Sequence, residues 1–474
     1  MKQPGFQPKF IFGRPNPHTT DPEPAYNSNL RNTSVSDIAG SFVSSDQLEE
    51  ARSLYGDNIR PFHIPVSEGV SRVLDDLSGI GNPFIVGGTV RDSIRGFHKD
   101  INDIDIEVHE TNVDEITDHM RDRGYMVDEV GKQFGVLKIH KKGVVDDLDI
   151  SVPRRENRTG AGHRSFDVDM DENMSLEEAS ERRDFTINAI MYDPELQVLV
   201  DHHCGVEDLS SGTLRHVSDK FSEDPLRVIR GFQFAGRFDM TIDPETAQLC
   251  QSIKDQYHEI STDRVQKEWT KFYEKSVNHN AGLKVLQDTG WDDTIPGLKE
   301  ALASPGLKEQ MSRMDKVSPE NKTLVGSTLI SMRMSSDDRK HFLGSTVSGK
   351  DNQRLVDIMV KTTESDMSTS FQRKNIAHNL ARTGFTFSRY LDLATATGDK
   401  RHYEAASQAV REGLGNGPEK DLFSGKDLLS ATGRKADNWV GEALKDMREL
   451  QYRGEFTTRE GAVKAIEDVM KKYQ

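Results

Sequence analysis

Short apolar runs and helical repeats alternate along the chain from Pro61 to about Asp201. A short apolar or alternating run beside glycine or proline predicts a β-strand, and apolar residues three or four positions apart predict a helix. We therefore expect helices at VRDSIRGF (90–97) and VDEITDHMRDRG (113–124), and strands at PFIVGG (83–88), DIDIEV (103–108), GVLKIH (135–140) and VVDDLDISVP (144–153). The pattern indicates an α/β or α+β domain.

The pattern changes on both sides of this domain. Residues 1–60 mix Pro, Asn, Ser and Asp without a sustained apolar period, so we expect a mobile extension with one short helix near SSDQLEEARSLYG (44–56). After FSEDPLRVIRGFQFAGRF (221–238) the strand signals fade, and helical spacing continues to the C-terminus. We predict an α+β fold with a small mixed sheet at residues 61–202, followed by all-α segments at 203–276 and 277–474.

Composition and charge exclude several classes of protein. The net charge of −16 argues against a globally basic nucleic-acid binder, although a site needs only local positive potential. Neither a membrane span nor the apolar run of a signal peptide is evident, so we expect a cytoplasmic protein without a membrane contact. Cys204 and Cys250 lack CxxC spacing, so we expect free thiols. We expect no zinc at His202, His203 and Cys204, because three adjacent residues cannot all converge on one ion.

Two glycines follow the first predicted strand. Phe84–Val86 lead into Gly87 and Gly88, and TVRDSIRG then begins a helix. Glycines let backbone N–H groups approach a polyanion closely, and a helix N-terminus adds partial positive charge. The turn therefore suits a phosphate or triphosphate, although a tight connection between strand and helix is the alternative.

A pair of aspartates lies on the next predicted strand. The side-chain period of two places Asp103 and Asp105 on one face, while Ile104 and Ile106 point into a core. Two carboxylates this close repel each other unless cations neutralise them, and Mg²⁺ is the usual partner. An exposed acidic strand face is the alternative.

A third carboxylate is expected on the strand VVDDLDISVP. Asp147 and Asp149 share one face of this strand, and Asp146 lies on the other. Spacing alone does not choose between Asp147 and Asp149.

The chain resembles the tRNA nucleotidyltransferase and bacterial poly(A) polymerase family, the class II branch of the polymerase-beta-like nucleotidyltransferases. The resemblance runs from about Phe84 to the tail SGKDLLSATGRKADNWVGEAL (424–444) and leaves out the first sixty or so residues. Five stretches carry it in order: VGGTVRDSIRG, DIDIEV, LDISVPRRE, RRDFTINAIMYD and FSEDPLRVIRGFQFAGRF. It implies a nucleotidyltransferase head followed by a helical neck, body and tail.

The resemblance also implies roles for individual residues. Asp103, Asp105 and Asp149 match the family's catalytic carboxylates, which bind two Mg²⁺ ions. Gly87 and Gly88, together with Arg91, match its nucleotide-phosphate turn. The motif that holds the triphosphate and the ribose 2′-hydroxyl matches Arg182, Arg183, Asp184 and Asn188. A ribose contact implies an NTP rather than a dNTP.

The motif EDPLR suggests how a base is selected. Pro225 is tolerated early in a helix, so Asp224 and Arg227 are expected at i and i+3 on one helix face. An acceptor beside a donor complements the amino group and ring nitrogen that cytosine and adenine both present. The pair would then accept CTP and ATP without a template. The alternative is that Glu223 and Asp224 offset a helix dipole and Arg227 forms a surface ion pair.

Two basic stretches are candidates for RNA contacts. PRRENRTGAGHRSF is expected to be a mobile loop carrying Arg154, Arg155, Arg158 and Arg164. The segment Lys350–Arg411 suits phosphates of a tRNA acceptor arm, while its aromatic residues Phe371, Phe385, Phe387 and Tyr390 are expected in the core. Its basic residues are Lys361, Arg373, Lys374, Arg382, Arg389, Lys400 and Arg401.

These features predict a template-independent, Mg²⁺-dependent nucleotidyltransferase that adds C and A to tRNA 3′ ends from CTP and ATP. A poly(A) polymerase, a CC-adding or A-adding specialist and a non-catalytic RNA-binding protein remain alternatives. The expected partners are tRNA, CTP and ATP, and no protein partner is predicted.

Overall fold

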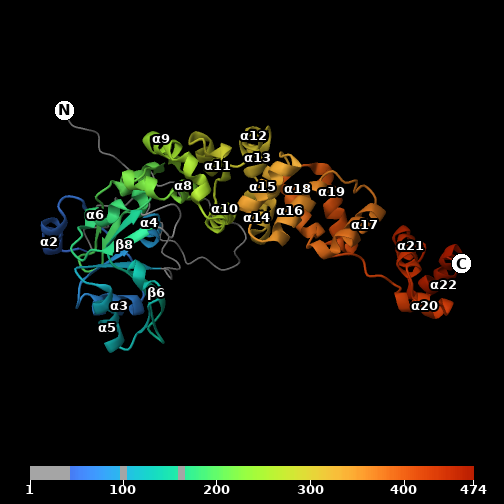
Figure 1. Ribbon diagram of the computed structural model, residues 1–474, viewed down its shortest axis with the longest axis horizontal. Helices are drawn as coiled ribbons and strands as arrows, with labels where there is room; N and C mark the ends of the chain where they lie inside the picture. The colour runs from blue at the N-terminus through green and yellow to red at the C-terminus, as the bar shows by residue number, and fades with distance from the viewer. Residues whose placement is uncertain (1–42, 97–103, 159–165, 474) are drawn as a thin grey trace. The chain divides into compact units, whose positions relative to one another are not determined.

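The computed structural model describes residues 43–96, 104–158 and 166–473, and within these it leaves the side chains of 156–158 and 166–169 undescribed (Figure 1). The chain divides into two compact units, Met1–Ser261 and Thr262–Gln474. In the part of the chain that the structure describes, no helix has both the length and the apolar character that a membrane span needs.

An eight-stranded mixed sheet forms the centre of the first unit. Its order is β1-β10-β9-β2-β3-β6-β5-β4, in which β3 and β6 are parallel and the other neighbouring pairs are antiparallel. All four predicted strands are confirmed, as β2, β3, β5 and β6. The eight strands are β1 (Ile59–Pro61), β2 (Asn82–Val86), β3 (Asp105–His109), β4 (Met126–Asp128), β5 (Val136–Lys141), β6 (Val145–Ser151), β9 (Met191–Asp193) and β10 (Val198–Val200).

One face of the sheet is covered by α3 (Glu68–Leu77) and α5 (Val113–Asp122), which Figure 1 shows near each other. The apolar side of each helix enters one core with Ile104 and Ile106, which are both almost fully buried. Alternation along β3 therefore directs the isoleucines into this core and its acidic residues to the opposite face.

The opposite face carries α2 (Ser45–Tyr55) and α6 (Leu176–Glu181). Ala51 is completely buried in a core that includes Phe84 and Val86 of β2, and the Tyr55 hydroxyl donates to Asp193 Oδ2 at 2.7 Å. The helix expected near residues 44–56 is confirmed. The expectation that all of residues 1–60 form a mobile extension is wrong for residues 43–60, because α2 and β1 pack into the head.

The elements that follow complete the first unit. The expected basic loop at residues 153–166 is partly a hairpin, because β7 (Arg154–Arg158) pairs with β8 (Phe166–Met170). The other elements are η2 (Lys132–Phe134), α4 (Gly88–Ile94), η3 (Thr186–Asn188), α7 (Gly205–Ser211), β11 (Thr213–Leu214), η4 (Asp219–Glu223), α8 (Leu226–Phe238), β12 (Thr241–Ile242), α9 (Pro244–Ser252) and η5 (Lys254–Glu259).

The second unit is helical throughout its described residues. It begins with α10 (Thr262–Lys275), so the division between units falls before this helix and not at the expected position after residue 276. Trp269 and Phe272 on α10 are fully buried, and Trp269 contacts Phe342 of α15 edge-on. These contacts explain why α10 belongs to the second unit.

The remaining helices of this unit follow in chain order. They are α11 (His279–Asp288), η6 (Trp291–Asp293), α12 (Leu298–Ala303), α13 (Leu307–Met311), η7 (Met314–Lys316), η8 (Pro319–Asn321), α14 (Lys322–Ser331), α15 (Ser336–Thr346), α16 (Lys350–Thr362), α17 (Ser370–Leu380), η9 (Ala381–Thr383), α18 (Phe387–Thr397), α19 (Lys400–Ala409), η10 (Val410–Leu414), α20 (Gly425–Thr432), α21 (Trp439–Arg453), α22 (Arg459–Met470) and η11 (Lys471–Tyr473).

The packing of α2 gives a test of stability. Replacing Ala51 with Asp places an unpaired carboxylate in a core without room for it, so we expect a loss of at least about 2 kcal/mol in the free energy of unfolding. Ser53→Asp introduces the same side chain on the exposed side of the helix and should change stability by less than about 0.5 kcal/mol. Chemical denaturation of both variants measures the difference, and equal losses would contradict the packing of α2 on the sheet.

Candidate active site

Two of the predicted carboxylates lie on neighbouring parallel strands. Asp105 on β3 is the register partner of Asp149 on β6, and Ile106 is the partner of Ile150. Paired residues of adjacent strands point to the same face, so the two carboxylates project together while the isoleucines enter the core. The structure thus places Asp149, and not Asp147, beside Asp105, a choice that spacing left open.

A lysine lies on the other side of Asp149. Lys138 on β5 is the second register partner of Asp149, and its Nζ lies 3.1 Å from Asp149 Oδ1. Asp105, Asp149 and Lys138 therefore form one row across three strands. The two carboxylates of this row favour positive charge beside them, and the ammonium group of Lys138 supplies one such charge next to Asp149.

The row provides oxygen ligands that suit a hard divalent cation. Among the described residues, no group of three His, Cys, Asp or Glu side chains is arranged to hold a metal ion. Asp103 lies outside the described residues, so its position beside Asp105 stays a prediction. Asp105 and Asp149 fit such a cation by the chemistry of their oxygens and by their shared face.

The glycine turn lies directly against this row. Val86 at the end of β2 pairs with Asp105, and Gly87 follows with φ 72° and ψ −133°. A Cβ atom at Gly87 would lie 3.3 Å from Asp105 Oδ2 and 3.5 Å from Arg183 Nη1. The absent side chain therefore leaves space between the carboxylate and the guanidinium, and Gly88 begins α4 beside that space.

A buried glutamate lies on the same face of β3. Glu107 is completely buried, and its Oε2 accepts hydrogen bonds from Arg182 Nη2 and from Arg183 Nη2, the latter at 3.3 Å. Its Oε1 lies 3.3 Å from His109 Nε2. Burial acts to raise the pKa of Glu107, but the two guanidinium groups and His109 outweigh it and hold the pKa below its usual range.

Our sequence reasoning missed Glu107. The signal was present, because the alternation that placed Asp103 and Asp105 on one face continues to Glu107 in DIDIEV. Its partners Arg182 and Arg183 lie 75 and 76 residues further along the chain. Local spacing does not show such a pairing.

Asp184 and Asn188 form a second buried network. Asp184 Oδ1 accepts from Phe185 N at 2.8 Å and from Asn188 Nδ2 at 2.9 Å, while its Oδ2 accepts from Arg230 Nε at 2.7 Å. Burial acts to raise the pKa of Asp184, but Arg230 and these hydrogen bonds outweigh it and lower the pKa to about 2. Asn188 Oδ1 in turn accepts from Arg91 Nη1 at 2.6 Å.

Arg91 lies within the packing between α4 and α8. It is nearly fully buried, forms an ion pair with Asp92 at 2.9 Å, and places its Cζ 4.5 Å from the ring centre of Phe238. Asp92 also pairs with Arg237 of α8 at 3.3 Å. The structure assigns Arg91 a set of internal partners, and its expected nucleotide contact stays a prediction.

The geometry of the EDPLR motif differs from the expectation. Helix α8 begins at Leu226, so Asp224 precedes the helix and does not share a helix face with Arg227. Asp224 Oδ1 accepts from Leu226 N at 3.1 Å. Arg227 lies in the first turn and donates to the carbonyl oxygens of Lys220 at 2.7 Å and Arg182 at 2.6 Å. The expected helical i, i+3 pairing was wrong, because Asp224, the residue before Pro225, has an extended backbone and lies outside α8.

The segment at residues 201–206 anchors the first turn of α7. The two carboxylate oxygens of Asp201 accept from Gly205 N at 2.8 Å and Val206 N at 2.9 Å, which fixes the start of α7. His203 Nε2 lies 2.8 Å from Ser180 Oγ.

The basic hairpin is tied to neighbouring elements. Arg155 pairs with Asp171 at 2.6 Å and with Glu178, and Arg154 donates to a backbone carbonyl of η2. The predicted RNA contacts of these residues stay predictions. The side chain of Arg158 and the whole of Arg164 lie outside the part that the structure describes.

The basic segment Lys350–Arg411 divides into buried and accessible parts. Arg373 is buried and forms an ion pair with Glu412, and its expected phosphate contact stays a prediction. The expected core positions of Phe385, Phe387 and Tyr390 are confirmed by their burial.

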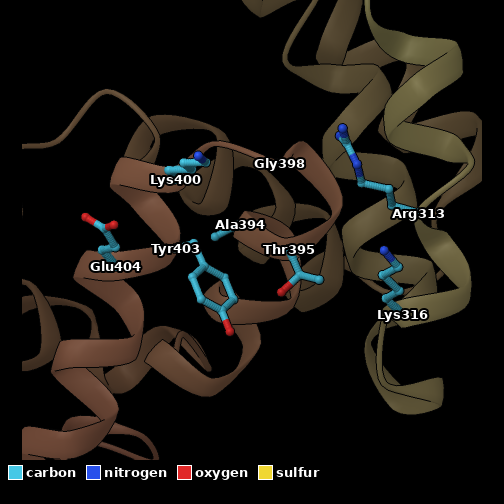
Figure 2. A pocket seen from close by; sticks show the side chains of 8 residues that line it. All are labelled: Arg313, Lys316, Ala394, Thr395, Gly398, Lys400, Tyr403 and Glu404. Atoms are coloured by element: carbon cyan, nitrogen blue, oxygen red, sulfur yellow. The ribbon is translucent and has the colours of Figure 1, made fainter.

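The accessible part includes a pocket of about 240 Å³ in the second unit. Figure 2 shows Lys400 and Tyr403 of α19 on one side and Arg313 and Lys316 on the other. Arg313 donates to the carbonyl oxygens that end α18, at 3.1 and 3.3 Å. Arg313, Lys316 and Lys400 outnumber the one carboxylate of the lining, Glu404, so the pocket favours an anionic ligand.

The head matches known sequences closely. Residues 83–215 match a family described as the poly A polymerase head domain. The chain is 37% identical over 212 residues to a multifunctional CCA protein of Aliivibrio salmonicida, and this alignment covers 44% of this chain and 49% of that protein. It is 36% identical over 210 residues to one of Stenotrophomonas maltophilia, covering 43% and 48%. The chain thus spans about half the length of the curated relatives it matches.

Solved structures resemble the whole chain in fold. A CCA-adding enzyme of Bacillus stearothermophilus in complex with CTP has a TM-score of 0.64 at 20% identity and covers 86% of this chain and 98% of its own. A Thermotoga maritima CCA-adding enzyme complexed with tRNA has a TM-score of 0.57 at 17% identity, covering 93% and 98%. These similarities confirm the predicted fold class, an α+β domain with a mixed sheet followed by a helical region.

Gly87 gives a test of the site with a matched control. Gly56 has nearly the same backbone angles, φ 71° and ψ −151°, but nothing lies within 4 Å of a Cβ built there. We expect Gly87→Ala and Gly56→Ala each to cost about 1–3 kcal/mol in stability, because both positions favour glycine. Only Gly87→Ala should also weaken binding of inorganic triphosphate, by about tenfold, since its methyl group would press on Asp105 Oδ2 and fill the space beside Arg183. Calorimetric titration with magnesium present measures the affinity, and equal affinities for the two variants would refute the assigned turn.

Proposed function

We propose that this protein is a template-independent RNA nucleotidyltransferase that adds C and A to the 3′ end of tRNA, since residues 83–215 match the family described as the poly A polymerase head domain. It uses CTP and ATP and releases pyrophosphate. The observation that carries the proposal is the register pairing of Asp105 with Asp149 beside the turn at Gly87. The substrates, tRNA and nucleoside triphosphates, suggest that it acts in the cytoplasm.

Asp105 and Asp149, with Asp103, are proposed to hold two Mg²⁺ ions. Magnesium supplies a Lewis acid that activates an RNA hydroxyl and neutralises the charge of departing pyrophosphate. The chain's own contribution is the close placement of oxygen ligands on two strands whose opposite face is fixed in a core. Because these ligands are already in place, the protein groups need to move little during the reaction.

The turn and its neighbouring arginine are proposed to bind the triphosphate. Gly87 leaves room for a phosphate between Asp105 and Arg183, and backbone N–H groups at Gly88 border that space. Arg183 offers a planar set of donors that suits phosphate oxygens.

Asp184 is proposed to accept the ribose 2′-hydroxyl. A carboxylate has about four acceptor positions, and the three hydrogen bonds from Phe185, Asn188 and Arg230 fix the group in one orientation. A remaining lone pair on Oδ2 would discriminate an NTP from a dNTP, because a dNTP would leave it unpaired.

Arg227 and Asp224 are proposed to read the base. The two carbonyl bonds hold Arg227 in one place and use two of its five N–H groups. A rigid donor group near an acceptor complements the edge shared by cytosine and adenine. The wrong bases would leave buried polar groups unpaired.

The name of the head family favours a second candidate, a poly(A) polymerase. The two functions differ in primer and in product length. We expect the purified protein to extend a tRNA transcript lacking CCA by C, C and A, and a transcript lacking only the terminal A by one ATP. Extension of an oligo(A) primer into a long product with ATP alone would identify a poly(A) polymerase and overturn the proposal.

The paired carboxylates give a direct test of the proposed chemistry. Asp105→Asn and Asp149→Asn each remove a charge that the metal site needs, so we expect kcat to fall at least about a hundredfold. Asp146→Asn removes a charge from the same strand β6 but from its other face, and should leave kcat within about twofold. Single-turnover CTP incorporation measures the rates, and an active Asp149→Asn would show that this residue is not a metal ligand.

The pocket of the second unit gives a test of RNA binding. We propose that Lys316 and Lys400 contact phosphates of tRNA, so replacing each with Gln should weaken binding and reduce the salt dependence, log Kd against log salt, by about 0.9 for each lost contact. Lys340→Gln, an exposed lysine paired with Asp337, is the control and should change neither quantity. Filter binding over a salt series measures both, and an unchanged slope in the pocket variants would exclude these contacts.

A further inference from the structure

We infer that Glu107 is a positioning residue that holds Arg183 in place to bind the triphosphate and competes for this guanidinium with Asp105, the proposed metal ligand. The inference rests on the proposed function, and it concerns a residue that does not itself touch the substrate.

The first observation is that the charged side chain of Glu107 lies in the interior of the head. Glu107 is completely buried on a strand whose alternate residues already form a large apolar core. An ionised carboxylate in this position costs free energy unless it is paired and hydrogen-bonded. Its two oxygens are used by Arg182, Arg183 and His109. The arrangement therefore orders two guanidinium groups and an imidazole around one buried carboxylate.

The second observation is that Arg183 extends from Glu107 to the glycine turn. Its Nη2 donates to Glu107 Oε2 at 3.3 Å, while its Nη1 lies 3.5 Å from the position that a Gly87 Cβ would occupy. The guanidinium is planar and rigid, so fixing one end fixes the direction of the other. Glu107 thereby aims the outer N–H groups at the space assigned to phosphate.

The third observation is that a competing carboxylate lies close by. Asp105 Oδ2 is 3.3 Å from the same Gly87 Cβ position and is therefore a near neighbour of Arg183 Nη1. Without Glu107, Arg183 would be free to turn towards Asp105, because a guanidinium seeks a carboxylate partner. An ion pair there would compete with both the triphosphate and the divalent cation. Glu107 thus competes with Asp105 for the guanidinium of Arg183.

The test is Glu107→Gln in the full chain, which keeps the shape and removes the charge. We expect KM for CTP to rise about tenfold and the Mg²⁺ concentration for half-maximal activity to rise severalfold, while KM for tRNA stays within about twofold. Glu107→Asp, which keeps the charge on a shorter side chain, should restore part of the loss. Glu268→Gln is the control, because it removes another buried, ion-paired carboxylate in the second unit and should leave these constants unchanged.

A double-mutant cycle distinguishes positioning from general stabilisation. If Glu107 acts through Arg183, Glu107→Gln should have almost no further effect on CTP binding in an Arg183→Lys background. Calorimetric titration with CTP gives this result without any RNA, so it tests the inference even if tRNA is not the primer. Lower thermal stability of Glu107→Gln with unchanged CTP affinity, or fully additive effects in the cycle, would overturn the inference. A wild-type protein that binds CTP but does not extend tRNA would instead overturn the proposed function.

Discussion

The parallel pairing of β3 with β6 is the constraint on which the site depends. It is the one parallel pair between neighbours in the described eight-stranded sheet, and its register sets Asp105 against Asp149. Like charges directly opposite each other destabilise a sheet. Burial of Ile106 and Ile150 on the other face stabilises the register nonetheless, and Lys138 offsets part of the repulsion. The core thus holds in place an arrangement of acids that would not form on its own.

Partly buried ion pairs extend this arrangement from the sheet to α8. Asp184 pairs with Arg230, and Asp92 pairs with both Arg91 and Arg237, so two residues of α8 bind to carboxylates of the head. A buried pair loses much free energy when one partner is removed, because the other charge is left without compensation. These pairs therefore favour one placement of α8 within the first unit, which a loose apolar contact would not specify.

The sequence allowed prediction of the features that depend on local alternation. The four strands and the burial of Ile104 and Ile106 follow from the period of two, and the structure confirms them. Features that depend on distant pairings were missed. Ala51 of α2 packs against residues of β2, which lie more than thirty positions later in the sequence. Glu107 pairs with arginines some 75 residues away. The resemblance to a family named most of the candidate residues, but it did not show which are held by internal partners.

Arg182 joins the two halves of the proposed nucleotide site. Its side chain donates to Glu107, which also holds Arg183 beside the turn, and its backbone carbonyl accepts from Arg227. The residue proposed to read the base is therefore bonded to the same short segment that orients the phosphate-binding group. A displacement of this segment would move both together. Under the proposed function no paired base aligns the substrate, so a rigid connection between base and phosphate contacts is a physical means by which the protein itself can provide that alignment.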